Sequence, residues 1–299
     1  MRPIADVLAE IEPWQRAASL TYEPLDGGLT NHTYKVVVDG RIYVLRINGQ
    51  QNECLGLDRA LEIEVIQQAE SLGFGPKVFS VDNQRDYLIT EYQAAPALSA
   101  ELARQPDMLQ RMAETLRAVH RMPAPTQRQC NPFHLIRAYL QGAQNAGITV
   151  PERLNPHLQR LDEIERRRRV DPAYGQCYCH NDYFHFHILC DDRLTVLDWE
   201  LSGYGDPFFD VATMPYAIGF TPDEEEYWLV SYFGTCDQAK RDTLKDMKFV
   251  GLVREISWAL LHVALEPNPI NHHMDYGAFA FQVIQMLDDG RLSFGESSS

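Results

Sequence analysis

The chain has 299 residues, of which 45% are hydrophobic and 23% are charged, and this is the composition of an ordinary globular protein long enough for two lobes. Its 42 acidic and 27 basic residues give a net charge of −15, which argues against a general nucleic-acid or anionic-membrane surface. No stretch reaches the roughly 18 consecutive apolar residues of a membrane span, and the first residues lack the pattern of a secretion signal, so we expect a cytoplasmic protein.

The first ninety or so residues alternate strand and turn signals around one helix. Residues 33–38 and 41–47 have strand character and are joined by Asp39-Gly40, a dipeptide that favours a tight hairpin turn. Residues 58–72 have apolar side chains at helical spacing and end at Gly73. Further strands follow at 78–81 and 86–92. This region predicts a small antiparallel sheet with one helix.

The remainder is predicted to be mainly helical. Six segments have helical periodicity: 106–122, 133–145, 153–169, 222–234, 238–265 and 276–289. Only the segment 177–198, which has the pattern of a strand hairpin, interrupts them. We therefore predict an α+β protein of two lobes, a small antiparallel β lobe at 1–93 and a larger helical lobe at 94–299.

The segment Cys179–Asp210 carries most of the chemistry. Asp182 precedes a strand pair at 188–190 and 194–197, and Asp198 follows it, so the two carboxylates are expected near one end of the hairpin. Carboxylates in this order suit magnesium-assisted phosphoryl transfer, in which one orients the acceptor hydroxyl and others hold the metal. Asp206 is a natural helix N-cap, and for Asp210, one turn later, simple exposure to solvent is the alternative to a role in the site.

Several of these motifs resemble one family. Three motifs resemble those of the choline/ethanolamine kinase branch of the aminoglycoside phosphotransferase superfamily: His180-Asn181-Asp182, Asp198-Trp199-Glu200, and Gly205-Asp206-Pro207 with Asp210. Asp26 to Asn31, followed by Tyr34, resembles the nucleotide loop of that branch, and Tyr43-Val44-Leu45-Arg46 its next strand. The resemblance implies a protein-kinase-like fold with a nucleotide-binding N-terminal lobe, and an ATP-dependent small-molecule kinase.

The resemblance also implies site residues. Asp182 takes the catalytic position, and Arg46 takes the position of the cation that binds the nucleotide phosphates. The glutamate that pairs with this cation is Glu62, with Glu64 left open. The nucleotide is further expected to contact Gly27, Gly28, Thr30 and Asn31 in the glycine turn, and Glu91 and Tyr92 beside the adenine.

One position departs from the family pattern. The fifth residue after the catalytic aspartate is asparagine in the family and binds magnesium, but here it is His187. Magnesium prefers oxygen ligands, whereas imidazole suits later transition metals. We expect Asp198 as the main metal ligand, with His187 binding Mg²⁺ through water or favouring Mn²⁺. A kinase-fold binding protein with little or no activity is the first alternative.

A zinc-dependent hydrolase is a more distant alternative. The six cysteines do not form a secreted disulfide framework and are expected to be reduced. The ligands of such a hydrolase would be His180, Asp182, His185 and His187, with Cys177 or Cys179.

The acceptor implied by the resemblance is choline or ethanolamine, ahead of thiamine, other amino alcohols and aminoglycosides. Aromatic faces and carboxylates in the helical lobe would hold its ammonium group. The candidate pocket residues are Glu200, Tyr216, Glu255 and Trp258. The corresponding region of the sequence also contains the aromatic residues Trp199 and Tyr276. Each of these side chains also suits core packing. The sequence leaves the oligomeric state open.

Overall fold

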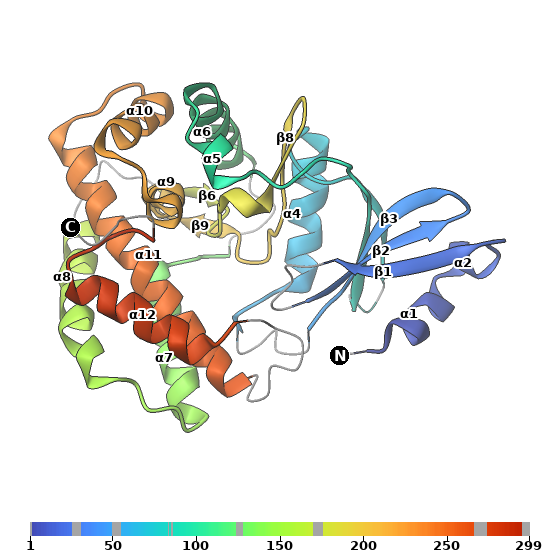
Figure 1. Ribbon diagram of the computed structural model, residues 1–299, viewed down its shortest axis with the longest axis horizontal. Coiled ribbons are helices and arrows are strands. Elements are labelled where there is room, and N and C mark those ends of the chain that lie inside the picture. Colours follow the sequence, from blue (N-terminus) through green and yellow to red (C-terminus); the bar gives the residue numbers. More distant parts are fainter. Residues whose placement is uncertain are drawn as a thin grey trace. The chain divides into compact units, whose positions relative to one another are not determined.

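The computed structural model describes residues 2–25, 31–49, 55–82, 84, 86–123, 128–169, 176–265 and 274–294 (Figure 1). The chain forms two compact units. Unit 1 contains residues 1–96 together with Leu189–Glu200, and unit 2 contains Ala97–Ile188 together with residues 201–299.

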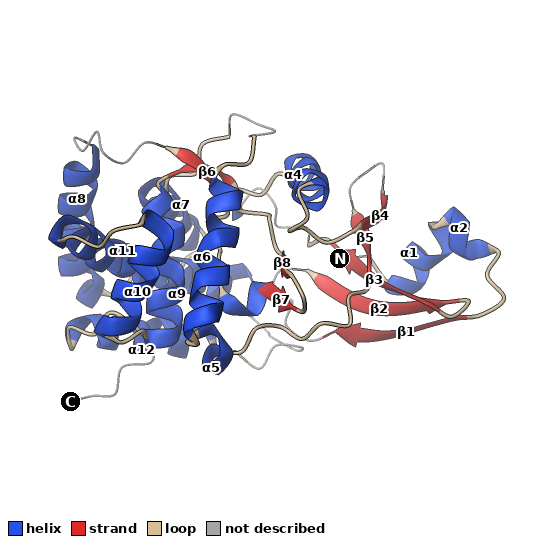
Figure 2. Cartoon of the chain, turned by 90° about the horizontal axis from the view of Figure 1, so that it is seen from above, coloured by secondary structure: helices blue, strands red, loops and turns tan. Residues whose placement is uncertain are grey.

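Unit 1 is built on a five-stranded antiparallel sheet in the order β1-β2-β3-β5-β4 (Figure 2). The strands are β1 (Leu20–Leu25), β2 (His32–Val38), β3 (Arg41–Ile47), β4 (Val78–Val81) and β5 (Tyr87–Glu91). Asp39 and Gly40 join β2 to β3 with positive φ angles of 48° and 81°, as a two-residue hairpin turn requires. The predicted α+β class is confirmed.

The core of unit 1 lies between this sheet and two short helices, α1 (Ile4–Glu10) and α2 (Glu12–Gln15). Val36, Leu45 and Ile47 alternate along β2 and β3 toward this core, and Trp14 packs against Tyr43 with ring centroids 5.5 Å apart. Helix α4 (Arg59–Ser71) begins at the N-cap Asp58, whose side chain accepts from two backbone N–H groups of the first turn.

The predicted hairpin is present as β7 (Ile188–Cys190) and β8 (Leu194–Val196). From Leu189 onward it belongs to unit 1, where the N–H of Val196 donates to Phe74 O at 2.7 Å. Trp199 is fully buried and donates through Nε1 to Val196 O at 2.9 Å. This tryptophan is therefore a core residue of unit 1.

Unit 2 is mainly helical, and all six helices predicted there occur close to their predicted places. The helices are α5 (Ala100–Ala103), α6 (Pro106–His120), α7 (Pro132–Asn145), α8 (Asn155–Arg169), α9 (Pro207–Met214), α10 (Pro222–Phe233), α11 (Gln238–Leu265) and α12 (Tyr276–Asp288), with 3₁₀ turns η1 (Glu152–Leu154) and η2 (His185–His187) and a π-helical turn η3 (Pro215–Gly219). Helix α11 is central and contacts α7, α9 and α12 (Figure 1).

Sequence reasoning missed a two-stranded sheet of unit 2, in which β6 (Cys177–Cys179) pairs antiparallel with β9 (Gly203–Gly205). A Cβ at Gly205 would lie 2.7 Å from Cys130 O, so the close approach of these segments requires glycine. Strand β6 leads directly into the loop that carries Asp182.

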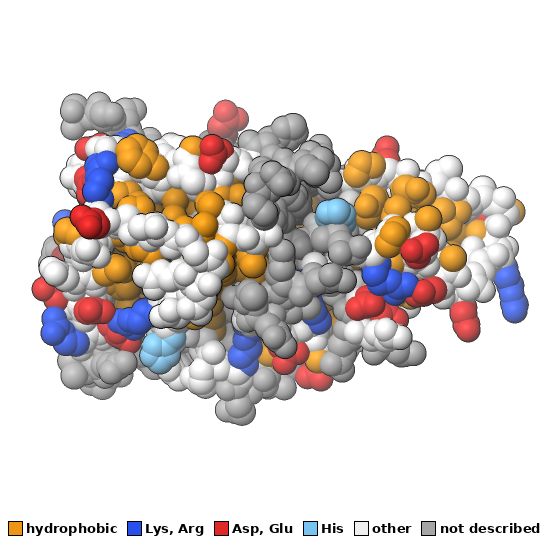
Figure 3. Space-filling view, turned by 90° about the horizontal axis from the view of Figure 1, so that it is seen from below, with side chains coloured by type: hydrophobic (Ala, Val, Ile, Leu, Met, Phe, Trp, Pro, Cys, Tyr) orange, Lys and Arg blue, Asp and Glu red, His pale blue; other side chains and the backbone are white. Residues whose placement is uncertain are grey.

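Within the residues described, no helix has the length and apolar character to span a membrane. On the face drawn in Figure 3, acidic (red) and basic (blue) side chains are scattered among one another. The coloured residues of this face thus show no broad basic patch of the kind that nucleic acid would need.

Candidate active site

The loop His180-Asn181-Asp182 follows β6 and is fixed by a buried carboxylate. Asp210, in the first turn of α9, accepts from the N–H of His180 at 2.7 Å and from the N–H of Asn181 at 2.6 Å. Asn181 has a φ of 64° and donates through Nδ2 to Leu201 O at 3.0 Å. A left-handed residue held on all sides in this way is typical of functional loops. Asp210 is fully buried, which excludes the alternative that it faces solvent.

Asp182 is paired with an arginine that sequence reasoning missed. Arg254, on α11, donates through Nη2 to Asp182 Oδ1 at 2.7 Å, and only 5% of its side chain is exposed. Burial tends to raise the pKa of Asp182, but Arg254 outweighs it and holds the pKa below its ordinary value. Asp182 is therefore ionised at neutral pH. A single arginine inside an apolar helical segment was the available signal, since such a charge needs a partner.

His187 also turns toward Asp182. Its Nδ1 lies 3.0 Å from Asp182 O and 3.3 Å from Asp182 Oδ2. The imidazole therefore adds a second positive or donating group beside the carboxylate, on the short η2 turn that leads into β7.

Two of the predicted pocket residues lie next to Arg254. Tyr216, on η3, donates to Glu255 Oε1 at 3.0 Å, and the same oxygen lies 3.2 Å from Arg254 Nη2. Burial raises the pKa of Glu255. The guanidinium of Arg254 lies over the ring of Phe184 at 5.6 Å from its centroid. We call Asp182, His187, Tyr216, Arg254 and Glu255 the Asp182 cluster.

The third pocket candidate in unit 2, Trp258, belongs to a different group of rings. It contacts His262 at 4.4 Å and Tyr276 at 5.5 Å between ring centroids. These ring contacts lie within α11 and between α11 and α12, as in helix packing, and the role of Trp258 in a substrate pocket stays a prediction.

In unit 1, Arg46 is paired with Glu62. Arg46 Nη1 lies 2.6 Å from Glu62 Oε1, and the glutamate is 1% exposed. Glu64 is exposed. The choice left open by the sequence is therefore decided geometrically, because Glu62 lies on the inner face of α4 and Glu64 does not.

Glu62 is shared with a second arginine that the sequence did not single out. Arg59 Nη1 lies 2.8 Å from Glu62 Oε2 and 2.7 Å from Glu200 Oε2, and Arg59 Nη2 donates to Asn31 Oδ1 at 2.9 Å. Asn31 in turn donates to Glu200 at 3.1 Å. Glu200, a predicted pocket residue, is thus part of this set in unit 1. We call Asn31, Arg46, Arg59, Glu62 and Glu200 the Arg46 network.

Carboxylate oxygens of Glu62, Asp198 and Glu200 lie within 4.8 Å of one another. Asp198 has a φ of 62°, a left-handed conformation at the end of the β7–β8 segment. Oxygen donors grouped in this way fit Mg²⁺ or Mn²⁺. Asp198 belongs to unit 1 and His187 to unit 2, so their joint role as metal ligands stays a prediction.

Glu91 and Tyr92, which are predicted to lie beside the adenine, use their backbone amides within unit 1. The N–H of Glu91 donates to Lys77 O at 2.8 Å, and that of Tyr92 donates to Ile42 O at 3.2 Å, so both amides are used within unit 1. Their contact with adenine stays a prediction. Gly27, Gly28 and Thr30 lie outside the described residues.

The ligand set of the zinc-hydrolase alternative is not assembled. His180, Asp182, His185 and His187 do not form a group of ligand atoms within 4.8 Å in the part of the chain that the structure describes. Cys177 and Cys179 do lie together, but their third neighbour is His120, which sequence reasoning did not consider.

Comparison with known proteins identifies the family. Residues 21–239 match the model of the phosphotransferase enzyme family. The chain is 25% identical over 292 residues to probable choline kinase 1 of Arabidopsis thaliana, with 85% of this chain and 81% of that protein covered. It is also similar to a crystal structure of a choline/ethanolamine kinase family protein from Mesorhizobium loti, with a TM-score of 0.77, 25% identity, and coverage of 95% and 92% of the two chains.

A crystal structure of the choline kinase LicA from Streptococcus pneumoniae shares the fold, with a TM-score of 0.76, 22% identity, and coverage of 95% and 99%. The family model covers well over half of the chain, and the predicted resemblance is confirmed. The chain belongs to the phosphotransferase enzyme family, in its choline/ethanolamine kinase branch, and is a small-molecule kinase.

Proposed function

We propose that the protein transfers the γ-phosphate of ATP to the hydroxyl group of choline or ethanolamine. The observation that carries the proposal is the carboxylate of Asp182, which Arg254 Nη2 holds at 2.7 Å on a backbone loop fixed by Asp210. Phosphoryl transfer to an alcohol needs such a fixed acceptor of the hydroxyl proton, because catalysis rests mainly on positioning and charge.

Asp182 orients the hydroxyl oxygen of the acceptor toward the phosphate and takes its proton as the O–P bond forms. Arg254 and His187 keep this carboxylate ionised before the acceptor binds. Arg254 also restrains the carboxylate, because its Nη2 donates to Asp182 Oδ1 at 2.7 Å. The bond to the leaving ADP breaks as the new bond forms, and the proton stays on the protein until the product leaves.

The nucleotide is assigned to unit 1. Arg46 would bind its phosphates, and Glu62 fixes the orientation of that guanidinium through a buried ion pair. Asp198, with Glu200 beside it, would hold the divalent cation, and the oxygen donors fit this role. When bound, that cation supplies neutralisation of the phosphate charge.

The acceptor is assigned to the Asp182 cluster. The face of Phe184 accepts the Arg254 cation at 5.6 Å, and Glu255 offers a carboxylate within the same group. An aromatic face and a carboxylate are the groups that bind an alkylammonium. They support an amino alcohol, and the names of the relatives narrow it to choline or ethanolamine.

The test is an ADP-release screen with choline, ethanolamine, thiamine and a set of aminoglycosides, each with Mg²⁺ and with Mn²⁺. We expect turnover of choline or ethanolamine above the others. Asp182→Asn should abolish turnover, whereas Asp192→Asn, a change at an exposed turn residue, should leave it intact. His187→Asn should raise the rate or shift the metal preference toward Mg²⁺.

Two outcomes would contradict the proposal. If no alcohol is phosphorylated with either metal while ATP analogues still bind, the protein is a binding protein on a kinase scaffold. If Asp182→Asn retains full turnover, the carboxylate is not the acceptor of the hydroxyl proton.

A further inference from the structure

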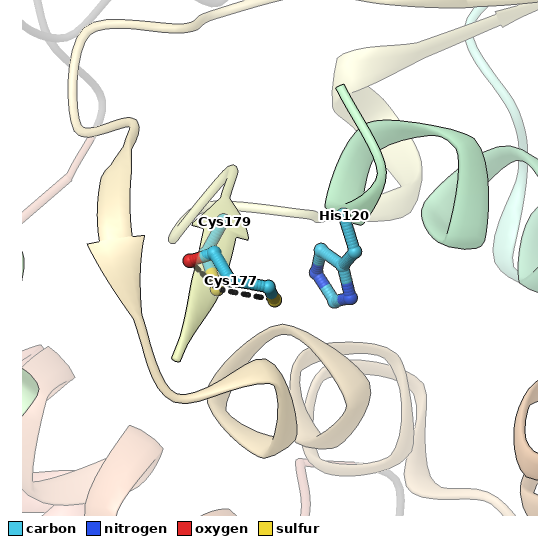
Figure 4. Close-up of side chains that lie close together, drawn as sticks. All are labelled: His120, Cys177 and Cys179. Atoms are coloured by element: carbon cyan, nitrogen blue, oxygen red, sulfur yellow. Dashed lines mark hydrogen bonds between the residues drawn. The ribbon is translucent and has the colours of Figure 1, made fainter. Parts of the chain in front are cut away.

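Unit 2 contains a second group of reactive side chains that the kinase reaction does not use. His120 is the last residue of α6, and Cys177 and Cys179 lie on β6, just before the Asp182 loop. The two cysteines share one face of the strand because they are two residues apart. Figure 4 shows the imidazole of His120 facing the Cys177 sulfur, with Cys179 behind it. We call these three residues the His120 cluster.

The spacing of the three side chains is that of metal ligands. One nitrogen of His120 and the two sulfurs all lie within 4.8 Å of one another. The sulfurs are 3.6 Å apart, which is much longer than a disulfide bond. Two sulfurs at about 2.3 Å from a tetrahedral zinc ion would lie roughly 3.8 Å apart. The dithiol therefore needs only a small adjustment to bind one ion.

A buried carboxylate orients the histidine as in many zinc sites. His120 Nε2 lies 2.9 Å from Asp210 Oδ2, so this nitrogen can donate its proton to the carboxylate. Nδ1 contacts the hydroxyl of Tyr232, so an ion that binds either ring nitrogen replaces one of these two hydrogen bonds. A carboxylate behind a ligating histidine fixes its tautomer and raises its basicity.

We propose that His120, Cys177 and Cys179 form a binding site for a thiophilic divalent cation of the zinc type. Two thiolates and an imidazole prefer such an ion to Mg²⁺, so this site is chemically distinct from the oxygen donors that suit the nucleotide-bound metal. The three protein ligands leave the fourth position to a non-protein ligand, and Cys177 is partly exposed, which gives solvent access. The site does not depend on the identity of the acceptor.

The three side chains of the His120 cluster affect one another's protonation. The hydrogen bond with Cys179 and the proximity of His120 lower the pKa of Cys177 to about 6, so one thiolate is present at neutral pH. Burial raises the pKa of the Cys179 thiol. Burial would lower the pKa of His120, but Asp210 raises it to about 9. An ion bound by these three side chains takes the place of any proton on its ligand atoms, so its affinity falls as the pH falls.

A cation bound in the His120 cluster would also affect the loop that carries Asp182. Asp210 holds His120 through one oxygen and the backbone of His180 and Asn181 through both. A cation that fixes His120 thus fixes the carboxylate that anchors the Asp182 loop. We expect zinc to raise the midpoint of thermal unfolding, because it binds the folded state.

The experiment uses the full chain, freed of metal by a chelator and kept reduced by a phosphine. Zinc affinity is measured by competition with a chromophoric chelator, and Co²⁺ is added as a spectroscopic probe. We expect one tight equivalent of zinc per chain and a thiolate-to-cobalt charge-transfer band. Cys177→Ser and Cys179→Ser should each weaken zinc binding at least about tenfold. The matched control is Cys190→Ser, a free cysteine outside the cluster, which should bind as the wild type does.

A measurement on the unmodified protein guards against variants that fail to fold. Alkylation followed by peptide mapping should show that zinc lowers the labelling of Cys177, and leaves that of Cys190 and Cys236 unchanged. The proposal is overturned if the wild type binds no tight zinc, if bound Co²⁺ shows no charge-transfer band, or if zinc shields the control cysteines instead. Loss of zinc binding in Cys190→Ser equal to that in Cys177→Ser would also overturn it. Failure of the alcohol screen leaves these readouts unaffected.

Discussion

Replacement of Arg254 by methionine tests the electrostatics of the Asp182 cluster. Methionine keeps much of the length and apolar volume of the side chain but removes the charge. Both ends of the ion pair are largely inaccessible, with 5% of the Arg254 and 15% of the Asp182 side chain exposed. The variant therefore leaves the carboxylates of Asp182 and Glu255 buried close to Tyr216 without their cation.

The cost follows from this burial. Removal of one partner of a buried ion pair destabilises a protein by about 3–5 kcal/mol, because the remaining charge loses its compensation. At about 2 °C or more per kcal/mol for a chain of this size, the midpoint of thermal unfolding should fall by roughly 6–10 °C. Arg241→Met is the matched control, since Arg241 pairs with Glu226 on the surface, with 38% and 55% of these side chains exposed. It should cost about 0–1 kcal/mol.

The pH dependence gives a second readout with a defined sign. Because the pKa of Asp182 is lowered in the folded protein, its pairing with Arg254 stabilises the protein above the ordinary value of 3.8 and is lost as the pH falls through the folded value. The stability gap between wild type and Arg254→Met should be full at pH 7 and close in acid. The acid limb of the rate profile should move to higher pH in the variant.

The reasoning about Arg254 is refuted if Arg254→Met loses no more stability than Arg241→Met. It is equally refuted if the acid limb of the rate profile stays where the wild type has it.

The remaining predictions concern the Arg46 network and the packing of Tyr216. Glu62→Gln should lower stability by about 3–5 kcal/mol and raise the KM for ATP, because Arg46 loses its buried partner and Arg59 loses one of its two carboxylates. Glu64→Gln, at an exposed site, should stay within about 0.5 kcal/mol of wild type in thermal unfolding. Equal effects of the two changes would contradict the assignment. Gly251→Ala should cost about 1–3 kcal/mol and raise the KM for the acceptor rather than for ATP, because the new Cβ would lie 2.3 Å from the ring of Tyr216. Gly277→Ala, whose Cβ meets no atom closer than 3.4 Å, is the control and should stabilise by up to about 1 kcal/mol, so a loss there as large as at Gly251 would count against the packing argument.

The elements with strong local signals were predictable. Helix α11 occupies the predicted residues 238–265, because its long apolar periodicity does not depend on its neighbours. The Asp39-Gly40 turn likewise has a local cause, since only residues that tolerate positive φ suit it. The β6–β9 pair was missed because strands of three residues carry almost no periodic signal, and their pairing partners lie far apart in the sequence.

The residues of the candidate site also fall into those that local motifs reveal and those that depend on distant partners. Asp182 and Asp198 were recognised from short motifs, in which the order and spacing of the residues carry the information. Arg254 and Arg59 were missed because their partners, Asp182 and Glu200, are 72 and 141 residues away. The place of Asp210 stayed open for the same reason, since its helix position fits either solvent or the buried backbone of the Asp182 loop.

The sequence by itself determined the α+β class, the positions of the long helices, and the motifs that mark a phosphotransferase, because each rests on local periodicity or on fixed spacing. Only the tertiary structure decided that Glu62 rather than Glu64 pairs with Arg46, that Arg254 keeps Asp182 ionised, and that His120 meets Cys177 and Cys179. Burial and the approach of distant segments set these charges and contacts, and neither quantity is encoded in any short stretch of chain.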